Sequence, residues 1–189
     1  GIDELITKMR RSRVNWCDVF NRFIGGEQPD DYTWRRPQKR MWFQHGVYMP
    51  SVNKVGVGDI VVAVDSSGST GGHHREYFFG VLNQVIEDHN PTSVTVITCD
   101  AEVQTVRRYE QGDIVEDMDV KGDGGTRVEP VFRYVSEENI KCNALVYLTD
   151  MGIWDFPDNK PDYPVLWVST DPDCADAPFG ETTRIQVAA

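Results

Sequence analysis

The amino-acid sequence predicts a three-layer α/β sandwich, with helices on both faces of a central sheet that is mainly parallel and has one antiparallel edge strand. Apolar runs of strand length are nearly unbroken, as expected for strands covered on both faces. These runs alternate with segments of helical periodicity. One pair of strand-like runs is joined by a short turn at Asp100-Ala101, which is too short for a crossover and predicts an antiparallel hairpin.

Length and composition indicate one main domain with an N-terminal extension. The chain has 189 residues, of which 40% are hydrophobic, and a formal net charge of −11. We expect residues 1–50 to form a helical segment and an extended arm, and residues 51–189 to form the α/β domain. The negative charge disfavours binding to phosphate backbones and anionic membranes, so no nucleic-acid or membrane partner is expected.

The N-terminal extension divides into two parts. Apolar residues recur at helical spacing before Gly25-Gly26, which supplies a stop, so we expect one long helix or two short ones. The apolar residues are Leu5, Ile6, Met9, Trp16, Val19, Phe20 and Phe23. From Pro29 to Pro50 aromatic and basic residues mix, and Pro37 excludes a continuous helix, so we expect an extended arm. The arm could bind single-stranded nucleic acid or an acidic partner. The overall charge instead favours packing of its aromatic side chains on the neighbouring domain.

The first half of the α/β domain shows a strand, a helix and a hairpin. Residues 59–64 are a buried strand, and a helical stripe from Tyr77 to Ile86 ends before Asn90-Pro91. Residues 93–98 form the next strand, and residues 102–106 pair with it as the antiparallel edge.

The second half repeats the pattern. A glycine-rich loop, residues 121–126, leads to a helix from about Pro130 to Glu138, with proline acceptable in its first turn. Buried strands follow at residues 144–148 and 165–168, and the alternation of Arg184–Val187 predicts a last strand.

Targeting signals and cysteine motifs do not stand out. The chain lacks a long apolar run, so we expect a cytoplasmic location. It begins with Gly1 rather than Met, which suggests a piece of a longer polypeptide. The sequence has four widely spaced cysteines, Cys17, Cys99, Cys142 and Cys174. Their spacing excludes a CxxC zinc or redox motif, and Cys99 and Cys142 lie in strand-like runs, so we expect reduced thiols in the core.

The strongest chemical signal is Asp65-Ser66-Ser67-Gly68-Ser69, directly after a buried strand and before a helix. In open α/β sheets, ligands bind at the carboxyl ends of the strands. A turn at this place would direct Asp65, Ser67 and Ser69 to one point. A carboxylate and two hydroxyls are hard oxygen donors, which suit Mg²⁺ or Mn²⁺.

Two further segments bring oxygen donors to the same edge. Thr126 ends the glycine-rich loop, and Asp150 follows the strand 144–149. Five oxygen-bearing side chains on three loops, completed by water, match the needs of an octahedral cation.

This five-residue set resembles the metal-ion-dependent adhesion site of the von Willebrand factor A (VWA) domain, written DxSxS followed by a distant Thr and a distant Asp. The segments around Gly124-Gly125-Thr126, Leu148–Asp150 and Val165–Val168 resemble the VWA-like C-terminal domain of a family of predicted metal-dependent peptidases. The segment Trp34–Pro37, with Arg40, resembles the arm that precedes that domain.

The resemblance implies a function. Ser67, Ser69 and Thr126 would contact Mg²⁺, or Mn²⁺ or Ca²⁺, through their hydroxyls, and Asp65 and Asp150 would act largely through water. An acidic residue of a partner protein would complete the shell, so the domain would be a metal-dependent protein-binding module. The resemblance also implies a peptidase half elsewhere on a longer chain, or an AAA+ ATPase as partner.

The sequence departs from that family at Arg127, where Asp is expected. A cation pointing at the metal would weaken its binding. Successive side chains of an extended loop point to opposite sides, so we expect Arg127 to turn away and pair with Glu129 or a loop carboxylate.

Simpler and rival interpretations stay open. Asp65–Ser69 could be only a capped turn. A metal-dependent hydrolase could use the same pocket if Asp100, Asp123 and Asp155 were recruited, although no catalytic machinery is recognised in this chain. His73-His74 could bind a metal but are expected to be exposed to solvent. The acidic runs 116–119 and 171–176 are expected to be solvated loops.

Overall fold

The computed structural model describes residues 18–25, 31–37, 50–53, 57–66, 72–116 and 125–185. Two parts of the predicted arm are extended, β1 (Asp31–Pro37) and β2 (Pro50–Asn53), and they pair antiparallel as a two-stranded sheet of their own. β2 therefore begins at Pro50, the predicted boundary between the N-terminal extension and the α/β domain. The division of the chain into these two parts stays a prediction.

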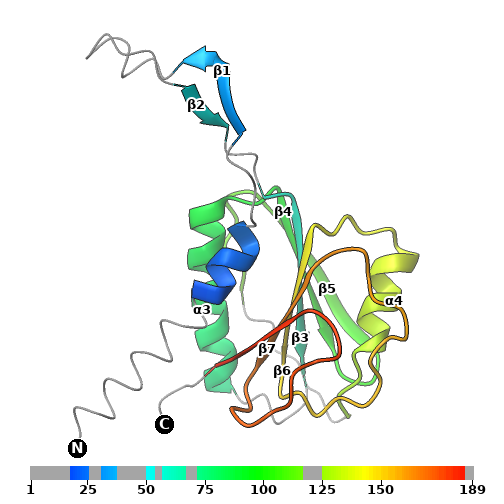
Figure 1. Cartoon of the computed structure of the whole chain (residues 1–189). Helices are drawn as coiled ribbons and strands as arrows, with labels where there is room; N and C mark the ends of the chain where they lie inside the picture. The colour runs from blue at the N-terminus through cyan, green and yellow to red at the C-terminus, as the bar shows by residue number, and fades with distance from the viewer. Residues whose placement is uncertain are drawn as a thin grey trace, which may run out of the picture.

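A six-stranded sheet forms the centre of the α/β domain, as predicted (Figure 1). Its order is β5-β4-β3-β6-β7-β8. The bounds are β3 (Asp59–Asp65), β4 (Ser93–Cys99), β5 (Val103–Glu110), β6 (Ala144–Thr149), β7 (Val165–Ser169) and β8 (Glu181–Arg184). Five of these strands are parallel to their neighbours, and only β5, at the edge beside β4, is antiparallel. The carboxyl ends of β3, β4, β6 and β7 therefore lie along one edge of the sheet.

The last strand lies earlier in the chain than the sequence pattern predicts, so the prediction of residues 184–187 was wrong. β8 ends at Arg184, which the sequence pattern takes as its first residue. The strand is a polar one at the sheet edge, and within it only Thr183 is buried. The sequence prediction was drawn to the apolar residue Ile185, which lies just beyond the strand. Ile185 is buried, and its backbone N–H donates to the Ser169 carbonyl at 2.7 Å.

One face of the sheet is covered by α3 (Gly72–His89) and the helical residues 18–25 (Figure 1). The core on this face is largely aliphatic, with the ring of Phe20 stacked on that of Phe78 at 6.1 Å between centroids. His89 Nε2 lies 3.2 Å from Asn21 Oδ1, which adds a polar link between the two helical segments.

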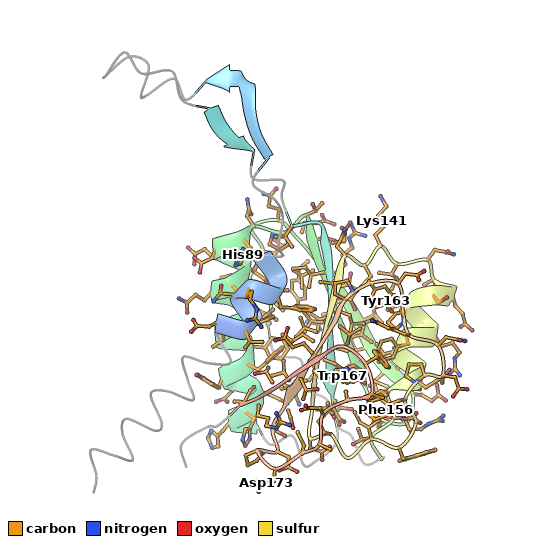
Figure 2. The ribbon with its side chains drawn as sticks, viewed as in Figure 1. His89, Lys141, Phe156, Tyr163, Trp167 and Asp173 are labelled. Carbon is orange, nitrogen blue, oxygen red and sulfur yellow. The ribbon has the colours of Figure 1, made fainter. Side chains whose placement is uncertain are left out.

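The opposite face is covered by α4 (Glu129–Glu137), and its core is rich in aromatic rings. The Trp167 ring lies in the interior, close to the ring of Phe156 (Figure 2). Stacking on Tyr147 at 5.3 Å and a hydrogen bond from Nε1 to the Phe179 carbonyl at 2.8 Å fix its orientation. Burial of so large a ring contributes roughly 4–6 kcal/mol of transfer free energy. This packing holds the sheet as a rigid support for the loops at its carboxyl edge.

The cysteines described by the structure are free thiols. Cys99 is in the core as predicted, whereas Cys142 and Cys174 are half-buried outside the strands, and Cys17 lies outside the described residues. Burial raises the pKa of both Cys99 and Cys142 to about 12, so both are protonated thiols near neutral pH.

Candidate functional site

Asp65 is the last residue of β3 and is 1% exposed. Its Oδ2 accepts a hydrogen bond from the Thr149 hydroxyl at 3.2 Å. Thr149 is itself fully buried at the end of the neighbouring strand β6. A carboxylate held this far from solvent needs polar partners, and Thr149 supplies one of them.

The turn after β6 positions Asp150. Met151 adopts a left-handed backbone with φ 64°, and its N–H donates to Thr149 Oγ1 at 3.1 Å. Asp150 Oδ1 accepts the N–H of Gly152 at 2.9 Å. Non-glycine residues in this region of φ carry strain that concentrates at functional sites. Thr149 therefore ties Asp65 to the turn that carries Asp150.

Thr126 is half-buried and enters the same edge from the loop before α4. The backbone of the next residue holds it in place: the Arg127 N–H donates to the carbonyl of Asp100, after β4, at 2.9 Å, and the Arg127 carbonyl accepts from the Tyr147 hydroxyl at 3.5 Å. The structure thus brings Asp65, Thr126 and Asp150 to one edge of the sheet.

Two of the five predicted ligands, Ser67 and Ser69, lie outside the described residues. The chain leaves β3 through Ser66, whose N–H donates to the Cys99 carbonyl at 2.9 Å. The Ser66 hydroxyl is buried, and within the part of the chain that the structure describes it has no hydrogen-bond partner. A buried hydroxyl without a protein partner is uncommon.

The donor set fits a hard divalent cation. Asp65, Asp150 and Thr126 supply oxygen atoms, and the unpartnered Ser66 hydroxyl shows that polar capacity remains at the end of β3. Over the described ranges, no group of three or more His, Cys, Asp and Glu residues is placed to hold a metal ion. The set is thus a mixture of carboxylates and hydroxyls, which suits a cation that keeps several waters.

Arg127 pairs with a loop carboxylate, as predicted. Its Nε donates to Asp155 Oδ2 at 3.1 Å, and its guanidinium lies 5.7 Å from the centroid of the Trp154 ring. Glu129, the other partner considered, pairs instead with Arg133 at 3.2 Å.

The carboxylates that a hydrolase would recruit have structural partners. Asp100 Oδ1 accepts from the backbone N–H groups of Ala101 and Glu102 and from Gln104 Nε2 at 2.9 Å. Asp155 Oδ1 accepts the Val128 N–H at 3.0 Å, at the start of α4. Asp123 lies outside the described residues.

A hollow of about 410 Å³ opens beside Asp150. Its walls include His74, Asp171 and Cys174. The Arg184 side chain holds this loop by donating to the Cys174 carbonyl at 2.8 Å. The side chain of His73 is 95% exposed as expected, whereas His74 is half-buried in the wall of the hollow.

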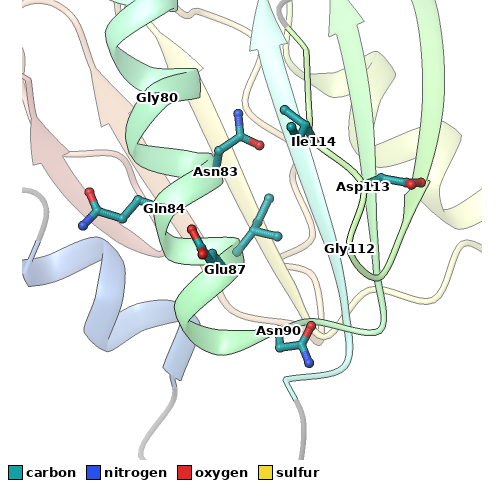
Figure 3. A pocket seen from close by; sticks show the side chains of 9 residues that line it. Gly80, Asn83, Gln84, Glu87, Asn90, Gly112, Asp113 and Ile114 are labelled. Atoms are coloured by element: carbon teal, nitrogen blue, oxygen red, sulfur yellow. The ribbon is translucent and has the colours of Figure 1, made fainter.

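A second hollow, of about 610 Å³, lies between α3 and the turn after β5 (Figure 3). Asn90 and Gly112 line it, next to the amino end of β4 and the end of β5. It is therefore at the edge of the sheet opposite to Asp65 and belongs to a different part of the molecule.

The family model described as VWA-like domain (DUF2201) matches residues 60–186. The chain belongs to this family. VWA-like domains often bind divalent cations and mediate protein binding.

The VWA-like chain is similar to the crystal structure of the ArnB paralog VWA2 from Sulfolobus acidocaldarius, with 15% sequence identity and a TM-score of 0.49. The match covers 60% of this chain and 34% of that chain, so this chain spans about a third of the length of that protein. No curated protein matches. In the described residues no helix is long and apolar enough to cross a membrane.

Sequence reasoning gave no role to Thr149, which the structure places between Asp65 and Met151. Its position directly before Asp150 was the available signal.

Proposed function

We propose that this VWA-like domain is a protein-binding module that uses one divalent cation to engage an acidic residue of a partner. The observation that carries the proposal is the position of three donors. Asp65 ends β3 and Asp150 comes directly after β6, the adjacent parallel strand, and Thr149 links the two ends. Thr126 lies at the same edge, in the loop before α4. The family match adds that domains of this type often bind such cations.

In this proposal Ser67, Ser69 and Thr126 hold Mg²⁺, or Mn²⁺ or Ca²⁺, through their hydroxyls, while Asp65 and Asp150 act largely through water. Neutral direct ligands leave a bound cation electrophilic, so it can accept a carboxylate oxygen from another protein. The hollow beside Asp150 gives room for the partner's side chain.

The decisive experiment is a calorimetric titration with Mn²⁺ of the parent and of Asp65→Asn. Asparagine keeps the size of the side chain and can still accept from Thr149, but it removes the charge. We expect the affinity for Mn²⁺ to fall by at least a hundredfold. The matched control is Asp59→Asn, because Asp59 begins the same strand, at its other end, and should leave the affinity unchanged.

Equal Mn²⁺ affinity in the parent and Asp65→Asn would remove the site assignment. Chelation with EDTA should leave the circular dichroism spectrum and the melting temperature of the parent nearly unchanged, since the core is built from strands and helices on both faces of the sheet.

We also infer, from the resemblance to predicted metal-dependent peptidases, that this domain is the C-terminal part of a longer protein and that an AAA+ ATPase is a partner. An antibody against the domain should detect a polypeptide much longer than 189 residues in the source cells. Co-purification of an AAA+ ATPase should be lost in Asp65→Asn.

A further inference from the structure

Trp154 is an exposed aromatic side chain close to the candidate site. It is 76% exposed and is one of two large apolar side chains with so much exposure among the residues that the structure describes. Folding gains little from an indole left in water. Tryptophan and arginine are the residue types most enriched where protein interfaces gain their affinity, and Trp154 lies against Arg127.

Arg127 is held in one orientation. Its backbone bonds to Asp100 and Tyr147 fix the chain, and its Nε is fixed by Asp155, a carboxylate that is 8% exposed. Over the described ranges, no side chain accepts a hydrogen bond from its Nη groups, and 36% of the side chain is exposed. A donor pair that is already oriented loses little conformational entropy when a ligand binds.

The pair of Arg127 and Trp154 also lies at the rim of the candidate cation site. Arg127 directly follows Thr126, and consecutive Cα atoms are about 3.8 Å apart. Trp154 is four residues beyond Asp150, so the chain keeps their Cα atoms within about 14 Å of each other. Both side chains therefore belong to the two loops that carry Thr126 and Asp150, within the span of a short extended peptide.

We propose that Arg127 and Trp154 recognise the partner as an acidic segment with two carboxylates and an apolar side chain. This inference rests on the proposed function. One carboxylate completes the shell of the cation, the second accepts from the Arg127 Nη groups, and the apolar side chain packs on the Trp154 ring. The guanidinium fork suits a carboxylate in both geometry and charge.

Charge explains why such a segment binds only with the cation in place. Asp65 ends a strand at this edge, Asp100, Asp150 and Asp171 lie just after strands there, and Asp155 neutralises much of the charge of Arg127. Without the divalent cation the edge repels an acidic segment, and with it the local balance favours one.

Two capped probe peptides test the inference. The first has a single aspartate between glycines. The second, the extended peptide, adds a glutamate and a phenylalanine, and it is made in two versions with one or two residues between the aspartate and the glutamate. Each is titrated into ¹⁵N-labelled protein with Mg²⁺, and the indole N–H signal of Trp154, assigned with Trp154→Phe, is followed. We expect the better extended peptide to bind at least tenfold more tightly than the first.

The variants separate the two proposals. Arg127→Gln and Trp154→Ala should each bring the extended peptide down to the affinity of the single-aspartate peptide. Both should keep the Mn²⁺ affinity within tenfold of the parent. Arg127→Lys, which keeps the charge but loses the fork, should retain only part of the gain, and Arg133→Gln, on the exposed surface of α4, should retain all of it.

If the parent binds no Mn²⁺, the proposed function fails. If it binds Mn²⁺ but the extended peptide binds no more tightly than the first, or neither peptide binds, the role of Arg127 and Trp154 is overturned while the cation site stands. The same conclusion follows if the gain persists in both Arg127→Gln and Trp154→Ala. The amide spectra of the variants report that each one is folded.

Discussion

The strand β3 begins and ends with an aspartate, and the two ends are built differently. At its amino end, Asp59 accepts from the Ser93 hydroxyl at 2.6 Å and lies 3.8 Å from the Arg108 guanidinium. The Asn143 side chain accepts the Asp59 N–H at 2.9 Å, and the Asn143 N–H donates to the Asp59 carbonyl at 2.8 Å. Figure 2 shows Lys141 at this edge of the sheet and Asp173 at the opposite one.

At the carboxyl end the polar groups are not matched in this way. Among the described residues the Ser66 and Thr98 hydroxyls are buried without hydrogen-bond partners, as the Tyr109 hydroxyl is nearer the amino end. Met151 has a left-handed backbone, whereas the left-handed residues before β4 and β6 are Asn90 and Asn139, a residue type that tolerates this conformation. The amino end thus uses the polar groups of Asp59, Ser93 and Asn143 for stability. The carboxyl end keeps the two unpartnered hydroxyls and a left-handed residue that is neither glycine nor asparagine, and both features reduce stability and are typical of a binding site.

The largest expected effect is a difference in the free energy of unfolding between alanine variants of two buried serines, Ser93 at the amino end of β3 and Ser66 at its carboxyl end. Ser93→Ala removes a hydrogen bond to a charged carboxylate and should lower the free energy of unfolding by about 1.5–3 kcal/mol. Ser66→Ala removes a hydroxyl without a partner and should leave the stability unchanged or raise it by up to about 1 kcal/mol. Urea denaturation in EDTA measures both. Equal losses would show that the two ends are not different.

A smaller effect should come from the backbone at Met151. Valine tolerates a φ of 64° poorly and glycine adopts it freely, so Met151→Gly should be more stable than Met151→Val by about 1 kcal/mol or more. The same pair at Ile153, two residues along the chain and not among the residues with positive φ, should give the opposite order. If valine is the better residue at both positions, the strain at Met151 is absent in solution.

The elements of the fold could be predicted from sequence where burial is strong. β3, β4, β6 and β7 are covered on both faces, so their apolar runs gave the positions closely. β8 was misplaced because an edge strand needs few apolar residues, and β1 with β2 carried no pattern that predicted their pairing.

The candidate site could be predicted only in part. Asp65, Thr126 and Asp150 were found because carboxyl ends of parallel strands converge and because their order matched a known pattern. The role of Thr149 and the pairing of Arg127 with Asp155 depend on which side chains meet across loops. Such contacts join residues far apart in the chain, and no periodicity encodes them.

The smallest effect concerns pH and Asp100, which follows β4 at the carboxyl end. Burial by itself raises the pKa of this carboxyl, but the hydrogen bonds from Gln104 and from the N–H groups of Glu102 and Ala101 outweigh it, so the pKa lies below its ordinary value. Near that ordinary value the unfolded chain therefore binds more protons than the native one, and stability rises with pH. The contribution of Asp100 is fully present above the unfolded pKa and is lost as the pH falls through the folded one.

Asp100→Asn and Gln104→Met should isolate that contribution. Urea denaturation at pH 7, 5, 4 and 3 should show a smaller loss of stability on acidification in Asp100→Asn than in the parent, with Gln104→Met between the two because it removes the side-chain donor only. The difference is small, since Asp100 is one of 30 acidic residues that titrate together. Parallel curves for the parent and Asp100→Asn would mean that the hydrogen bonds only offset burial. Asp100 would then hold the turn before Gln104 without adding to the pH dependence.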